Sequence, residues 1–432
     1  MAYGACFKAI RLGIGLGIAV LLFETGANYL LWLENGKLHL SEAWTRPVAA
    51  AVIKEFVTKI HPWFGFIHEY TPEFAHAHGM VANNFGFSQR ATYAAKFDFC
   101  CDFPILPERH PDLFLVGLFG NSVARGLADA AQTEAWFEQD IARLPEAAGK
   151  RVMLLNLAVG GHRQPQPLLI YSYLAAMGMK FDLVLYFGAG NEAVAGRINL
   201  QEGVPYAFPM SRTWATLTRS LEQNAAHDTA GILALLFRHA AQSGQTQVAE
   251  CLTATCVVAN RALYKAGNTA AGWVAAAGTE SAATASHFKT DQPQPLLAGE
   301  RDQDQAIVYA WQQSSAMMAA AVAVTGGRFL EVLVPSPWLH PSGRNPPEVS
   351  PEEIAEESGP YRTLLPRMAA AAAELRVQGV RVADATTLMN DVLPDDDQVY
   401  LDHHGHLGPL GLERVLHFAI LELQRKTVEP NN

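Results

Sequence analysis

The chain has 432 residues, 50% of them hydrophobic, so its length and composition allow one large or two ordinary domains with a sizeable core. The formal net charge is −10, and no basic run could follow a phosphate backbone, which argues against nucleic acid as a partner. The five cysteines do not make a disulfide framework and are interpreted as inert thiols. The alternative is a bridge between Cys251 and Cys256 in an oxidising compartment.

Residues 12–33 form an apolar stretch with a single charge, Glu24, and the stretch is long enough to span a bilayer. Lys8 and Arg11 precede it, so the positive-inside rule keeps the N-terminus in the cytoplasm. This pattern predicts a single-pass protein of the bacterial inner membrane with its main domain in the periplasm. A cleaved signal peptide is the alternative. Because a carboxylate is costly in lipid, we expect Glu24 to face a protein partner or to lie near the interface.

Residues 34–112 have no clear hydrophobic period and are interpreted as a juxtamembrane segment. Strand-like and helix-like stretches then alternate over residues 113–425. The predicted strands are 113–119, 151–157, 182–187, 329–334 and 380–383, and the predicted helices are 123–143, 166–178, 211–225, 306–325, 361–378 and 409–424. This alternation predicts an α/β fold, a three-layer α/β/α sandwich around a five-stranded parallel sheet. Residues 226–305 interrupt it and are interpreted as a helical or loop insert.

Ser122 stands between a buried strand and the start of a helix. Residues 113–119 are apolar throughout, and Gly120 and Asn121 then favour a sharp turn. The turn presents Ser122 at the carboxyl end of the strand, where open α/β sheets bind ligands. A serine there can be a nucleophile, with the free N–H groups of the helix start facing an oxyanion. The alternative is an ordinary tight turn in which serine caps the helix.

Two more turns follow the next predicted strands. Gly160 and Gly161 come after the second strand, and glycine lets a backbone N–H approach a reacting carbonyl closely. Asn191 follows the third strand, where its side-chain amide can donate to the same oxyanion or cap a helix. Taken singly, each turn also fits a purely structural role.

A histidine-rich run, Asp402-His403-His404-Gly405-His406, precedes the last predicted helix. A histidine there can take the serine proton, and a nearby aspartate can hold its tautomer. Three imidazoles so close could instead bind zinc. Because no second cluster with ligand spacing lies elsewhere, the sequence predicts neither a metal nor a cofactor.

The four stretches, in this chain order, resemble the SGNH (GDSL-like) hydrolase superfamily in its membrane-anchored bacterial form. The resemblance covers roughly residues 110–425 without the insert, and it includes a run beginning at His406, His-Leu-Gly-Pro-Leu-Gly, similar to the family's His-Leu-x-Pro-x-Gly ending. It implies a serine nucleophile, a histidine base oriented by aspartate, and an oxyanion hole completed by the serine N–H. The residues concerned are Ser122, His406, Asp402, Gly161 and Asn191.

Three positions depart from the family pattern. Asn121 replaces the usual aspartate before the serine, and Ala189 stands where the family has glycine. Asp402 precedes His406 by four residues rather than three, with His403 in the usual place. If Asp402 cannot reach the ring, the site would be a Ser-His dyad or inactive.

Two classes of function therefore remain open. The first is a membrane-anchored extracytoplasmic esterase or acyltransferase that uses a serine nucleophile, with envelope glycans as candidate substrates. The second is a catalytically degenerate SGNH-type subunit of a membrane complex, with a structural or interaction role. The non-catalytic role is favoured by the departures at Ala189 and His403, and also by Glu24 and the insert. The enzyme is favoured by the joint presence of the serine, the asparagine and the histidine.

Overall fold

A computed structural model of the chain divides into two compact units, one of residues 1–55 with 218–288 and one of residues 56–217 with 289–432. The structure describes residues 22–30, 33, 56–70, 72–82, 87–97, 111–201, 204–214, 217, 253–282, 302–342, 349, 351–393, 396 and 398–425. Each unit is described by itself below.

The second unit is built on a parallel five-stranded sheet with strand order β6-β5-β7-β8-β9. The strands are β5 (Leu113–Gly120), β6 (Arg151–Asn156), β7 (Leu183–Gly188), β8 (Arg328–Leu333) and β9 (Val382–Asp384). Every residue of β5 and β7 is buried, as expected for strands covered on both faces. The predicted α/β class and parallel sheet are confirmed, and the order reverses between β5 and β7, where such sheets bind ligands.

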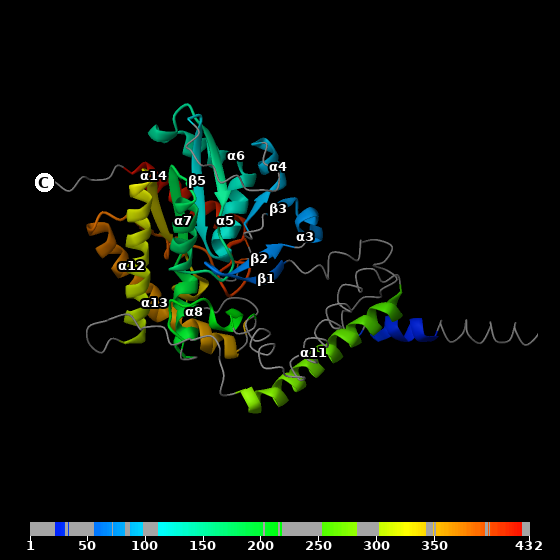
Figure 1. Cartoon of the computed structure of the whole chain (residues 1–432). Coiled ribbons are helices and arrows are strands. Elements are labelled where there is room, and N and C mark those ends of the chain that lie inside the picture. The colour runs from blue at the N-terminus through cyan, green and yellow to red at the C-terminus, as the bar shows by residue number, and fades with distance from the viewer. Residues whose placement is uncertain are drawn as a thin grey trace, which may run out of the picture. The chain divides into compact units, whose positions relative to one another are not determined.

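Helices cover both faces of the sheet. One face packs against α5 (Ser122–Thr133), α6 (Ala135–Ala142) and α14 (Pro409–Gln424). The other packs against α7 (Gln166–Ala176), α8 (Gly190–Gln201), α12 (Gln303–Val324) and α13 (Pro351–Val377). Figure 1 shows α7 and α12 on one side of β5 and α5 and α6 on the other. Side chains of β5 alternate between the two cores, with Phe114, Val116 and Leu118 in one and Leu115 and Phe119 in the other.

Residues 56–96 are more regular than the expected juxtamembrane segment, and they belong to the same unit as the sheet. They form a hairpin of β1 (Phe56–His61) and β2 (Gly65–Tyr70), then α3 (Pro72–Ala77), a second hairpin of β3 (Met80–Ala82) and β4 (Ser88–Arg90), and α4 (Ala91–Lys96). Their strands are short and pair with each other, so no long apolar run announces them. The interpretation of 34–112 as one segment without periodicity is wrong for this part.

In the first unit, residues 22–30 are helical, and α11 spans Ala254–Ala282 within the predicted insert. Glu24 accepts hydrogen bonds from the backbone N–H groups of Ala254 (2.5 Å) and Thr255 (3.0 Å) at the start of α11. The carboxylate thus has a partner within its own chain. Among the described residues, no helix combines the length and the apolar character needed to cross a bilayer. Residues 12–21, 31 and 32 of the predicted span lie outside the described residues.

Cys256, near the start of α11, is disulfide-bonded. The other cysteines of the chain lie outside the described residues. The expectation that the thiols are free is therefore wrong for Cys256.

Candidate active site

The turn after β5 presents Ser122 as the first residue of α5. Gly120 has φ +142°, and a Cβ there would lie 2.2 Å from the carbonyl oxygen of Phe187, so only glycine fits. The Asn121 side chain accepts from the backbone N–H groups of Val123 (2.9 Å) and Ala124 (3.4 Å) and caps the helix. Asn121 therefore stabilises the start of the helix that carries Ser122.

Ser122, His406 and Asp402 form a continuous chain of hydrogen bonds. His406 Nε2 lies 2.7 Å from Ser122 Oγ, and His406 Nδ1 lies 2.5 Å from Asp402 Oδ2. With the proton on Nδ1 donated to the carboxylate, Nε2 accepts from the serine hydroxyl, which is the tautomer that can take its proton. The contact expected between Ser122 and His406 is present, and Asp402 reaches the ring despite the four-residue spacing.

A tight turn joins Asp402 to His406. Leu401 N–H donates to the His406 carbonyl at 2.7 Å, and Gly405 N–H donates to the Asp402 carbonyl at 3.3 Å. Gly405 has φ +84°, a left-handed conformation that favours glycine. The two arms of the turn thereby place Asp402 and His406 side by side, and the backbone N–H of His406 also donates to Asp402 Oδ1 at 3.2 Å.

The charge of Asp402 is stabilised where it stands. Partial burial acts to raise its pKa, but hydrogen bonds and charge from His406, with a smaller contribution from His404, leave the pKa of Asp402 below its ordinary value. Each of the His406 and Asp402 side chains is 34% exposed. A substrate can therefore reach the ring from solvent while the carboxylate remains ionised at neutral pH.

The two predicted oxyanion-hole residues lie on segments that are tied together: Gly161 is in the loop after β6, and Asn191 is in the first turn of α8. Asn191 Nδ2 donates to the carbonyl oxygen of His162 at 3.2 Å. An amide nitrogen carries two hydrogens, so this bond orients the group while its second N–H stays available. Gly161 has φ +80°, and a Cβ on the adjacent Gly160 would lie 3.8 Å from Ser122 Cβ. The loop carrying both glycines thus passes close to the serine.

Glu192 fixes the turn between β7 and α8, next to Asn191 in the first turn of the helix. This side chain is 2% exposed and accepts from the backbone N–H groups of Ala189 (2.8 Å) and Gln164 (3.2 Å) and from the Tyr186 hydroxyl. Ala189 has φ +106° and is the only non-glycine described residue with positive φ. Ala189 therefore adopts a backbone conformation that favours glycine, and buried hydrogen bonds hold it there.

Sequence reasoning missed the contribution of the β1–β2 hairpin. His68, on β2, donates from Nε2 to the Gly160 carbonyl at 2.9 Å and accepts from the Thr58 hydroxyl at 3.1 Å. Burial lowers the pKa of His68 to about 4, so the ring is neutral at pH 7 and acts as a brace. His162 Nε2 similarly donates to the Phe66 carbonyl at 2.8 Å. The signal that could have revealed the hairpin is the Pro62–Gly65 turn between two short stretches that contain β-branched and aromatic residues.

The sequence matches no protein-family model, and no curated protein is similar to it. The interpretation of the site therefore rests on its own contacts.

Proposed function

We propose that this chain is an SGNH-type serine esterase or O-acyltransferase. The observation that carries the proposal is the continuous contact of Ser122, His406 and Asp402 at the start of α5. The loop that carries Gly161 and the first turn of α8 offer further N–H groups as oxyanion donors. The same three residue types in this arrangement perform acyl transfer on unrelated folds.

In the proposed reaction, Ser122 Oγ attacks the ester carbonyl carbon while its proton moves to His406 Nε2. Negative charge develops on the former carbonyl oxygen, which accepts hydrogen bonds from the N–H groups of Ser122 and Gly161 and from the Asn191 amide. His406 then gives the proton to the leaving alcohol, and an acyl-serine ester remains. Water or an acceptor hydroxyl attacks this ester, its proton passing to His406, and the serine is regenerated.

A fluorophosphonate probe tests the nucleophile directly, because it reacts with activated serines and not with ordinary ones. We expect the wild-type protein to be labelled and Ser122→Ala to remain unlabelled. Ser342→Ala is a matched control: this exposed serine also hydrogen-bonds a histidine, His340 Nδ1, at 2.7 Å, but it does not begin a long helix. Labelling should survive that change. A wild-type protein that resists the probe and hydrolyses no acyl ester would favour the degenerate, non-catalytic subunit instead.

We propose further that residues 12–33 anchor the protein in the inner membrane, with the esterase unit in the periplasm beside envelope glycans. The support is the apolar length of the segment and the position of Lys8 and Arg11 before it. Alkaline extraction should leave the protein in the membrane fraction. Release into the soluble fraction, or a mature N-terminus beyond Ala27, would replace the anchor with a cleaved signal peptide.

A further inference from the structure

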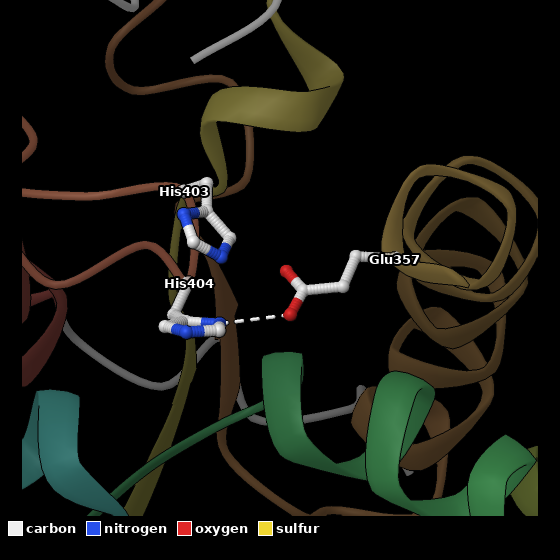
Figure 2. A group of neighbouring side chains, drawn as sticks. All are labelled: Glu357, His403 and His404. Atoms are coloured by element: carbon white, nitrogen blue, oxygen red, sulfur yellow. Dashed lines mark ion pairs between the residues drawn. The ribbon is translucent and has the colours of Figure 1, made fainter. Parts of the chain in front are cut away.

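A second cluster of titratable side chains lies beside the catalytic turn. It consists of Glu357 on α13 and the neighbouring His403 and His404, whose ligand-type atoms all lie within 4.8 Å of one another. Figure 2 shows the carboxylate of Glu357 directed towards the two imidazole rings, with the ion pair to His404 dashed. The distance between His404 Nδ1 and Glu357 Oε1 is 2.8 Å. These side chains therefore converge on one point from two separate parts of the chain.

The carboxylate of Glu357 is buried at a place where a nearby positive charge would stabilise it. The residue is 8% exposed, and its Oε2 atom is buried without a hydrogen bond from the described residues. A buried carboxylate oxygen in this state is costly unless a cation compensates it. His404 lies 2.8 Å from the other carboxylate oxygen, Oε1, and its side chain is 53% exposed, so it leaves Oε2 without a partner.

The backbone that carries the two histidines is held in place. Trp338 Nε1 donates to the His403 carbonyl at 2.9 Å, and the Tyr361 hydroxyl donates to the His404 carbonyl at 3.2 Å. Tyr361 lies one turn after Glu357 on the same helix, so α13 fixes both the carboxylate and the loop opposite it. The two imidazole rings have centroids 3.9 Å apart and an interplanar angle of 47°. The ligand groups are thus largely preorganised.

We propose that Glu357, His403 and His404 bind a divalent transition metal, Zn²⁺, with water in the remaining position. Two imidazoles and one carboxylate suit zinc, whereas calcium and magnesium prefer an all-oxygen set. Zinc–ligand bonds of about 2.0–2.2 Å place tetrahedral ligand atoms roughly 3.3 Å apart. The present separations, from 2.8 Å to at most 4.8 Å, reach that geometry through small side-chain rotations.

The metal would tie α13 to the turn that carries the proposed catalytic pair. The rings of His404 and His406 have centroids 6.2 Å apart, so the metal site is adjacent to the base but does not include it. Binding at this place would stabilise the folded turn, because a ligand that binds only the folded state raises its stability. This inference does not depend on ester chemistry, and its test reads the metal rather than activity.

The experiment uses the full chain, stripped with EDTA and exchanged into metal-free buffer. Zinc is titrated in competition with a chromophoric chelator, and the bound metal is counted by mass spectrometry. We expect one zinc per chain and a melting temperature that rises with zinc concentration. Glu357→Gln and His404→Ala should each weaken binding at least tenfold. His417→Ala is the control, since this exposed histidine on α14 pairs with Glu413 at 3.7 Å, outside the cluster, and should bind zinc as the wild type does.

Two results would overturn the proposal. One is the absence of stoichiometric zinc at micromolar concentrations in the folded wild-type protein. The other is binding that survives Glu357→Gln but disappears in His406→Ala, which would place the metal on the proposed catalytic pair. Circular dichroism of each variant separates loss of ligand from loss of fold. Ser122→Ala should bind zinc normally, so failure of the serine chemistry and failure of the metal site are distinguishable.

Discussion

Replacement of Asp402 by asparagine probes the proposed triad with the smallest change in shape. In the wild-type structure both carboxylate oxygens accept hydrogen bonds: Oδ1 from the backbone N–H of His406 at 3.2 Å and Oδ2 from its ring Nδ1 at 2.5 Å. An amide has one acceptor oxygen and one donor nitrogen. If its oxygen stays on the backbone N–H, its NH₂ faces Nδ1 and forces the ring proton onto Nε2. The imidazole then cannot accept the proton of Ser122.

The expected loss is large because the wrong tautomer removes the base and not merely a contact. We expect Asp402→Asn to lower kcat for a model acetyl ester by about 10³- to 10⁴-fold, equivalent to roughly 4–5.5 kcal/mol in the activation barrier. Initial rates with p-nitrophenyl acetate measure the effect, and Ser122→Ala sets the background. Asp391→Asn is the matched control, since that carboxylate pairs with Arg414 at 2.7 Å and its side chain is 65% exposed. It should leave kcat within about twofold.

Unchanged turnover in Asp402→Asn, with an unaltered melting temperature, would refute the assignment of Asp402 as the group that orients His406.

Three further outcomes follow from burial and backbone geometry. Gly120→Ala should lower the free energy of unfolding in urea by about 3 kcal/mol or more, because its Cβ would clash with a strand carbonyl. Gly359→Ala is the control, since this helical position is open, and it should raise the free energy of unfolding by about 0.5–1 kcal/mol. Equal effects of the two substitutions would refute the clash. Burial raises the pKa of Glu331 from 4.5 to about 8, against opposing contributions from Ser315 and Trp311, so stability is lost as pH rises from about 4.5 to about 8. Glu331→Gln should reduce this loss of unfolding free energy between pH 5 and pH 8.5 by on the order of a few kcal/mol. An equal loss in the variant and the wild type would contradict the prediction. His68→Ala should reduce kcat about 10- to 100-fold while the protein stays folded, because the hydrogen bond that holds the loop beside the serine is lost. An unchanged kcat would show that the loop keeps its position without this bond.

The central sheet could be predicted because its strands are buried on both faces. Apolar runs such as 113–119 and 182–187 are stable only when both of their faces are buried, so they indicate core strands. The observed strands begin and end within two residues of the predicted ones. The last helix, 409–424, was predicted with the observed bounds, because proline marks its first position. For the helix predicted at 361–378, the start was missed: α13 begins at Pro351 and includes Pro360 and Pro366 within the helix.

The contacts that complete the site could not be predicted from local pattern. His68 and Gly160 are distant in sequence, and only the fold brings the hairpin to the loop. Glu357 meets His404 for the same reason, since their contact depends on how α13 packs. Sequence order identified the strand-end residues because all parallel strands end at one edge, but it carries no information on which side chain from a helix or hairpin reaches that edge.

The turn at Gly405 has a consequence for how such sites diverge. A catalytic pair is defined by the approach of two side chains, and the number of residues between them matters only through the loop that joins them. Here the left-handed glycine absorbs one added residue, so the aspartate and histidine still meet. A pattern that fixes the interval at three would pair His406 with His403 and overlook Asp402. An insertion of this kind can pass without loss of the pair wherever a glycine is available to close the turn.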